Sequence, residues 1–245
     1  MKLLVCIMTC HKLDYFIDDL TIDWCSQQGL RSLDQQARVN TIRATWLTEL
    51  PEGFDYKFFY GTKLRDAKQN QRVPSKVTLR DPLSDEIFLD CGDGYTSNPY
   101  KMKEICRWAL DHGYDCILRC DDDTFIYPER LLVNDSSEWT GKDYVGASDN
   151  NFHPGGCVFL SRRMMELVIS ERVTTYADDL WMGQIAKDYR IPMTTLRTMR
   201  NQWGTGYKVP ASINPTGISS FHSCTPDVMR VLYAQSEVRS RRIDN

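Results

Sequence analysis

The stretch YDCILRCDDD, residues 114–123, predicts a short buried strand that ends in three carboxylates. The apolar run at 116–118 is typical of a strand inside a sheet. Just before it, residues 99–112 carry apolar side chains at helical spacing, and Gly113 can end that helix. A helix followed at once by a strand is the repeating unit of a mainly parallel α/β sheet. Ligands of such sheets bind at the carboxyl ends of the strands, which is where the three carboxylates lie.

The rest of the chain alternates strand and helix patterns, which supports the α/β class. There is no repeat, no low-complexity segment and no linker, so the 245 residues are expected to form one domain. Strands are expected at about residues 2–9, 57–61, 86–90, 143–146 and 157–161. Helices are expected at about residues 34–48, 162–171 and 178–189, and a last helix begins at Pro226.

Composition and charge exclude several classes of protein. The formal net charge is −3, so the chain lacks the positive charge that non-specific nucleic-acid binding requires, and no nucleic-acid partner is expected. The apolar start, residues 1–8, is too short to span a bilayer. With no signal peptide or transmembrane anchor predicted in this sequence, the protein is expected to be cytoplasmic or soluble, or else held at a membrane by something else. Nine cysteines without a CxxC pair are typical of reduced core thiols and lack the spacing of a zinc site.

The triplet Asp121, Asp122 and Asp123 indicates a metal site. Three carboxylates at the end of a buried strand repel one another unless a cation lies between them. A hard divalent ion such as Mn²⁺ or Mg²⁺ takes oxygen ligands and keeps coordination positions open for phosphate oxygens. The triplet therefore favours an enzyme that acts on a nucleotide diphosphate. The alternative is a solvated acidic loop, which is common in proteins.

Glycines mark two further segments. Gly155 and Gly156 lack side chains, so they either let the backbone approach a ligand closely or form a tight turn before the strand at 157–161. Residues 197–220 contain glycine and proline and show little periodicity, which is typical of a mobile binding loop. Trp181 and Trp203 are candidate platforms for stacking a sugar, or else core residues.

Seven segments, in order along the chain, resemble motifs of the fringe and β-1,3-galactosyltransferase group, glycosyltransferase family 31 and its relatives. CDDDTFI, residues 120–126, resembles the metal motif of that group, and FHSCTP, residues 221–226, its late histidine. The others are RVNTIRATW (38–46), YKFFYG (56–61), DGYTSNPYKMKEICRWA (93–109), PGGCVFLS (154–161) and ADDLWMG (177–183). Two features differ: Ala177 or Asp178 replaces the usual glutamate, and the Golgi anchor of animal members is absent. The chain is therefore most similar to the unanchored bacterial or large-virus relatives.

The resemblance implies a GT-A fold, with a Rossmann-like central sheet flanked by helices. About residues 1–125 would bind the nucleotide sugar, and about 126–245 the acceptor. It also implies an inverting transferase that uses Mn²⁺, or Mg²⁺, to move a sugar from a UDP-sugar to a glycan hydroxyl in surface-glycan synthesis. Galactose, N-acetylglucosamine and xylose are the candidate sugars. Neither the acceptor nor the oligomeric state is predicted.

The resemblance also assigns roles to single residues. Asp123 would bind the metal directly, Asp121 or Asp122 would hold the ribose or support the metal through water, and His222 would be the second protein ligand. Asp179, at the start of a helix, would be the catalytic base, with Asp178 as a weaker candidate. Donor-binding candidates are Thr9 and Cys10 at the uracil, the cations Arg38, Arg43 and Lys101, and the two glycines Gly155 and Gly156.

Two other classes of function are compatible with the triplet. A metal-dependent phosphoesterase of the haloacid-dehalogenase type would require a threonine where this chain has Phe125. A non-catalytic sugar-binding module would explain the aromatic residues and a metal site, but it would not need a base or a late histidine. Acceptor-free release of inorganic phosphate would favour the first, and binding without turnover the second.

Overall fold

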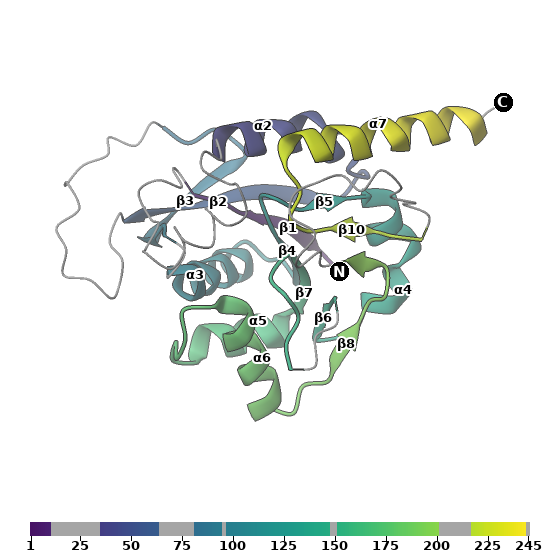
Figure 1. Cartoon of the computed structure of the whole chain (residues 1–245). Helices are drawn as coiled ribbons and strands as arrows, with labels where there is room; N and C mark the ends of the chain where they lie inside the picture. Colours follow the sequence, from purple (N-terminus) through teal and green to yellow (C-terminus); the bar gives the residue numbers. More distant parts are fainter. Residues whose placement is uncertain (11–34, 64–80, 95–96, 148–150, 201–216, 244–245) are drawn as a thin grey trace, which may run out of the picture.

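The central element of the fold is a seven-stranded sheet with the order β3-β2-β1-β4-β7-β6-β8 (Figure 1). The computed structural model describes residues 1–10, 35–63, 81–94, 97–147, 151–200 and 217–243. The strands are β1 Leu3–Met8, β2 Asp55–Lys63, β3 Glu86–Gly92, β4 Cys116–Asp121, β6 Tyr144–Gly146, β7 Cys157–Ser161 and β8 Met193–Thr195. Strands β3, β2, β1 and β4 are parallel, whereas β7 is antiparallel to both β4 and β6. The predicted α/β class with a mainly parallel sheet is confirmed.

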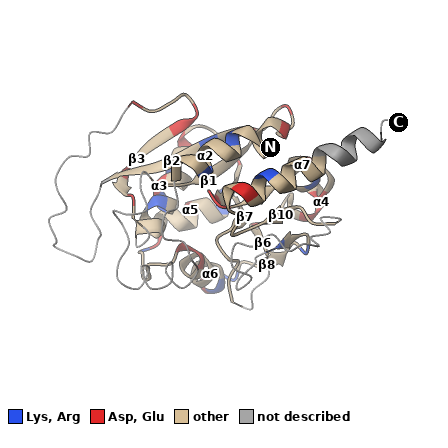
Figure 2. Ribbon diagram, turned by 45° about the horizontal axis from the view of Figure 1, so that its top comes forward, with Lys and Arg blue, Asp and Glu red and all other residues tan. Residues whose placement is uncertain are grey.

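Helices cover both faces of this sheet. They are α2 Gln35–Ala44, α3 Asn98–Asp111, α5 Arg162–Ser170, α6 Asp178–Asp188 and α7 Pro226–Ile243. Figure 1 shows α2 and α7 on one face, and α3, α5 and α6 on the other. Strand β1 serves both cores because its side chains alternate: Leu3, Val5 and Ile7 join the core under α2 and α7, and the intervening residues join the other. Charged residues of both signs are interspersed over the helices in Figure 2.

A second, three-stranded sheet brings the end of the chain to the acidic triplet. It consists of β5 Phe125–Ile126, β10 Ser220–Phe221 and β9 Met199–Arg200, in the order β5-β10-β9. Strand β10 is antiparallel to β5, and Phe221 pairs with Phe125. The Cys224 N–H donates to the Asp123 carbonyl over 2.7 Å. His222 follows β10 directly and is therefore held beside the triplet.

The structure differs from the sequence-based expectations in three places. The helix expected at 34–48 is α2 followed by a 3-10 turn, Trp46–Glu49. The stretch expected to be one binding loop, 197–220, contributes β9 and the first residue of β10, and Trp203, Gly204 and Gly206 lie outside the described residues. Strands β5, β8, β9 and β10 have two or three residues each, which is too short for an alternation pattern.

Two further expectations can be compared with the described residues. The eight described cysteines have free thiols, and all but Cys10 are buried, as predicted for core thiols. In the described part of the chain, none of the helices combines the length and apolar character needed to cross a membrane.

Candidate functional site

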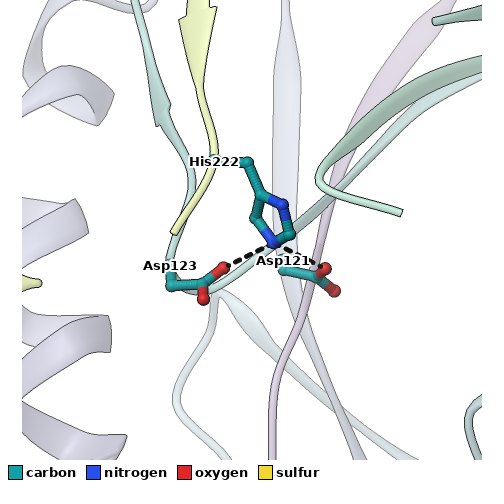
Figure 3. Close-up of side chains that lie close together, drawn as sticks. All are labelled: Asp121, Asp123 and His222. Carbon is teal, nitrogen blue, oxygen red and sulfur yellow. Dashed lines mark ion pairs between the residues drawn. The ribbon is translucent and has the colours of Figure 1, made fainter. Parts of the chain in front are cut away.

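Asp121, Asp123 and His222 form a compact group, here called the acidic corner (Figure 3). One ligand atom from each lies within 4.8 Å of the other two. The Nε2 atom of His222 is 3.2 Å from Asp123 Oδ1 and 3.5 Å from Asp121 Oδ2. Asp121 ends β4, Asp123 lies two residues further, and His222 follows β10, so two sheets build the group. Two carboxylates and an imidazole form a ligand set that suits Mn²⁺ and, through the carboxylates, Mg²⁺.

The electrostatics of the acidic corner show that it requires positive charge. Burial would lower the pKa of His222, but Asp123 and Asp121 outweigh burial and raise it to about 10. Burial would raise the pKa of Asp123, but the His222 imidazolium and Arg38 lower it to about 2. Without a metal, the two carboxylates therefore hold a proton on His222. A divalent cation could take the place of that proton, so metal affinity should rise with pH.

The middle carboxylate, Asp122, points away from the acidic corner. Its Oδ2 accepts hydrogen bonds from Thr9 Oγ1 at 2.5 Å and from Gln35 Nε2, and its Oδ1 accepts one from Arg38 Nη1 at 3.0 Å. Asp122 is buried, and both of its oxygens are used within the protein. Of the two sequence-based candidates for supporting the metal, Asp121 is therefore the one that the structure brings to the corner. Asp122 instead joins α2 to the ends of β1 and β4.

We expect Asp122→Ala to lower the free energy of unfolding by about 3–5 kcal/mol, because it leaves Arg38 buried without its closest carboxylate. Urea unfolding measures this loss. Asp122→Asn is the matched control because it keeps the shape and one acceptor oxygen, and its loss should be smaller. A change below about 1 kcal/mol for the alanine variant would show that Asp122 does not tie α2 to the sheet.

The predicted uracil and lysine positions lie together at the end of β1. Lys101 Nζ donates to the Thr9 carbonyl at 2.6 Å and to Asp93 Oδ1 at 2.7 Å. Burial would lower the pKa of Lys101, but Asp93 and Cys10 outweigh burial and raise it. The ammonium is thus a buried support for the end of β1, and its charge is balanced by Asp93. Cys10 is partly exposed, and burial together with Asp93 raises the pKa of its thiol.

The two arginines of α2 have different surroundings. Arg38 contacts the triplet, at 3.0 Å from Asp122 and 3.9 Å from Asp123. Arg43 instead pairs with Asp85 and Glu86, at 2.8 Å from each, beside the start of β3. The structure therefore brings Arg38 to the candidate donor site and leaves Arg43 in an ion-pair cluster at the other end of the sheet.

Gly155 and Gly156 make room for side chains of this chain. A Cβ atom on Gly156 would lie 2.6 Å from the Cβ of His222 and 2.8 Å from its Nδ1. A Cβ atom on Gly155 would lie 2.8 Å from Nη1 of Arg119. All three distances are too short for non-bonded atoms. Both glycines are thus closely approached by side chains of this chain, His222 and Arg119. The predicted contact with a ligand stays a prediction.

We expect Gly156→Ala to push His222 out of the acidic corner and to weaken Mn²⁺ binding about tenfold or more, as the loss of a ligand's support commonly does. Isothermal titration with Mn²⁺ measures this effect. Gly113→Ala is the control: Gly113 has φ +76° with no other atom within 4 Å of the added Cβ, so it costs stability without touching His222. Equal Mn²⁺ affinity in the two variants would contradict a ligand role for His222.

The candidate base and its neighbour lie in the first turn of α6. Asp179 is partly exposed, and its Oδ1 accepts a hydrogen bond from the Leu180 N–H at 2.7 Å. Burial raises its pKa, against hydrogen bonds from Leu180 and Gly155 and the charge of Arg119, which lower it. Asp178 is buried and pairs with Arg119 at 2.8 Å, and burial raises its pKa to about 6. Of the two, Asp179 is the more accessible to an acceptor.

Arg119 is a site residue that the sequence analysis missed. It lies within β4 and is 1% exposed, yet its Nη2 is 2.8 Å from both Asp121 Oδ1 and Asp178 Oδ2. The signal was present, because an arginine in an apolar strand must be paired with an acid to be buried. The sequence analysis also missed Gln35, which donates to Asp122, and Asp93, which pairs with Lys101. Neither is a charged residue inside an apolar strand, so the sequence did not mark them in that way. Trp181 is also 1% exposed and donates to the Arg172 carbonyl, so of its two predicted roles the structure supports that of a core residue and not that of a sugar platform.

Comparison with known proteins gives one family match. The family model described as Galactosyltransferase matches residues 37–139, a segment that begins in α2 and includes the triplet. The match ends before Gly155, Asp179 and His222. No curated protein matches the chain.

Three solved structures show limited similarity to the chain. A protein from Desulfovibrio desulfuricans G20, described as a nucleotide-diphospho-sugar transferase, has 12% identity and a TM-score of 0.45, with 80% of this chain and 79% of that chain covered. A glycosyltransferase involved in glycosylation of the major capsid of PBCV-1 has 11% identity and a TM-score of 0.42, with 93% and 99% covered. A197 from STIV has 10% identity and a TM-score of 0.41, with 80% and 82% covered.

The family match and the motifs agree over the same residues. Of the seven segments that resemble family 31, four lie wholly or almost wholly within 37–139, including the metal motif at 120–126. The acidic corner is built on that motif. Residues 37–139 therefore match the galactosyltransferase family model, and this segment contains most of the motifs on which the predicted resemblance was based.

Proposed function

We propose that this protein is an inverting, metal-dependent GT-A glycosyltransferase that moves a sugar from a UDP-sugar to a glycan hydroxyl. The observation that supports it most is that Asp121, Asp123 and His222 lie together at the carboxyl end of β4. Asp121 and Asp123 belong to the segment that matches the galactosyltransferase model. Ligands of α/β sheets bind at this edge. About residues 1–125 would bind the donor and about 126–245 the acceptor.

Asp121, Asp123 and His222 would hold the divalent cation, Mn²⁺ or Mg²⁺. When bound, the cation stabilises the negative charge that develops on the diphosphate as the sugar–phosphate bond breaks. Thr9 and Cys10 lie at the end of β1, beside β4, where they would contact the uracil. Arg38 lies between Asp122 and Asp123 and would keep the donor side of the site positive.

Asp179 would act as the base. Inversion requires one group that removes the proton of the acceptor hydroxyl while its oxygen attacks from the face opposite the leaving UDP. The raised pKa of Asp179 makes its carboxylate a stronger base than a solvated aspartate. The hydrogen bond from the Leu180 N–H would hold that carboxylate in a fixed orientation. We infer surface-glycan synthesis as the setting.

The test is thermal unfolding with UDP, with Mn²⁺ and with both. UDP at about 100 times its dissociation constant should add about 2.7 kcal/mol to stability, but only when Mn²⁺ is present. For a chain of this length, that corresponds to an increase in Tm of about 5–10 °C. EDTA should abolish the effect. No stabilisation by UDP with Mn²⁺ would contradict the proposal.

A panel of UDP-galactose, UDP-N-acetylglucosamine and UDP-xylose then identifies the donor. Slow hydrolysis of the preferred donor to free UDP is expected in the presence of Mn²⁺, because water can replace the acceptor. Release of inorganic phosphate from simple phosphoesters would instead favour a phosphoesterase. Binding of a sugar with no turnover of any donor would favour a sugar-binding module.

A further inference from the structure

Arg119 lies between the acidic corner and the first turn of α6, which carries the proposed base Asp179. Its Nη2 is 2.8 Å from Asp121 Oδ1, and Asp121 Oδ2 faces His222 at 3.5 Å. The same nitrogen is 2.8 Å from Asp178 Oδ2, in the first turn of α6. One guanidinium thus joins a carboxylate of the acidic corner to the residue that precedes Asp179.

The backbone around Arg119 is shaped for this contact. Gly155 leaves the space that Nη1 occupies, since a Cβ atom there would be only 2.8 Å from Nη1. Gly155 also lies near Asp179, because its backbone N–H contributes to lowering the pKa of that carboxyl. Arg119 therefore contacts the start of α6 through the Asp178 ion pair, and it also packs against Gly155, which lies near Asp179.

The surroundings of Arg119 do not suggest a purely stabilising role. Among the described residues, its buried Nε and Nη1 have no hydrogen-bond acceptor, and such orphan donors are costly. A buried ion pair of this kind is also weak support for stability, because two charges must leave water. The two ion pairs of Arg119 instead connect Asp121 to the first turn of α6 through one guanidinium group.

We propose that Arg119 is a positioning residue that couples the metal-side carboxylate Asp121 to the first turn of α6, so that donor binding orders the turn carrying Asp179. The inference rests on the proposed function, since it takes UDP with a divalent cation as the ligand of the acidic corner. Arg119 itself need not touch substrate. Its role is to transmit the position of Asp121 to Asp178.

Hydrogen–deuterium exchange of α6 tests this coupling. UDP is the probe, with Mn²⁺, because UDP lacks the sugar and so cannot contact Asp179 through it. In the wild type, UDP with Mn²⁺ should slow exchange in the first turn of α6 by about tenfold. In Arg119→Gln, the protein should still gain Tm with UDP and Mn²⁺, but the slowing at α6 should fall below about twofold. Arg119→Lys, which keeps the charge, should restore part of it.

Gly155→Ala is the second variant, needed if Arg119→Gln folds poorly. It keeps every charge but pushes Nη1 away, and it should reduce the slowing in the same way. Arg43→Met is the matched control, because it removes an arginine paired with two carboxylates at the other end of the sheet. It should lower stability and leave the UDP-dependent slowing at α6 unchanged.

The outcomes separate this inference from the proposed function. Equal slowing at α6 in Arg119→Gln and in the wild type overturns the coupling. Tm gain from UDP and Mn²⁺ with no slowing at α6 in the wild type also overturns the coupling and leaves the glycosyltransferase proposal intact. Absence of any Tm gain in the wild type contradicts both.

Discussion

Asp123→Asn should reduce kcat/KM by about 10²–10⁴, because it removes a charged ligand from the acidic corner and with it several kcal/mol of stabilisation of the leaving diphosphate. The variant should also lose the Mn²⁺-dependent increase in Tm with UDP. Asparagine keeps the size of the side chain, so the fold should be retained. Turnover of the preferred UDP-sugar to free UDP, measured across Mn²⁺ concentrations, gives both values.

The control for Asp123→Asn is Asp227→Asn. Asp227 lies in the first turn of α7, its side chain is 91% exposed, and it pairs with Arg230. Its substitution therefore removes the same charge without changing one of the three residues of the acidic corner. Its activity should be close to that of the wild type. Asp123→Asn activity within about threefold of wild type would rule out Asp123 as the main metal ligand.

Asp179→Asn should lose transfer by about 10²–10⁴ while keeping its affinity for UDP and Mn²⁺, because the amide cannot accept the acceptor proton. The same loss is expected for slow donor hydrolysis, in which water is the acceptor. Asparagine can still accept the Leu180 N–H, so the start of α6 should keep its structure. The measurements are kcat by UDP release and UDP affinity by titration.

The pH profile adds a second test of Asp179. A base acts in its deprotonated form, and burial raises the pKa of this carboxyl, so activity should fall with acid at a higher pH than an ordinary aspartate would allow. Asp188→Asn, at the far end of the same helix, is the control, because Asp188 bonds only to Gln184 in the described structure and is exposed. A normal turnover number for Asp179→Asn would exclude it as the base.

The two arginines of α2 illustrate what sequence spacing could not decide. Arg38 and Arg43 are five residues apart and so differ by about 140° around a helix. Only one of them could face the triplet, and which one depended on the rotation of α2 against the sheet. That rotation is set by the burial of Val39 and Ile42 in the core, which the sequence predicts only as an apolar stripe.

The acidic triplet is a second case, because the sequence could not decide which of its three aspartates face the metal site. Three adjacent aspartates predict a metal site, but Asp121 ends β4 and the next two residues form a turn, so their side chains point in different directions. Asp122 therefore faces Thr9 and Gln35, and Asp121 and Asp123 face His222. Its position in the family motif favoured Asp123 as the metal ligand, but the motif did not exclude Asp122 from supporting the metal. The hydrogen bonds of Asp122 within the protein separate its role from that of the other two aspartates.

Local pattern alone determined the α/β class, most of the longer helices and strands, and a carboxylate-rich end to a buried strand, because periodicity and strand ends are properties of neighbouring residues. Tertiary structure alone decided the reversed direction of β7, the arrival of His222 through the two-residue strand β10, and the bridge from Asp121 to Asp178 through Arg119. These features join residues that are far apart in the chain. Their free energy comes from packing and charge pairing across the fold, which no single segment encodes.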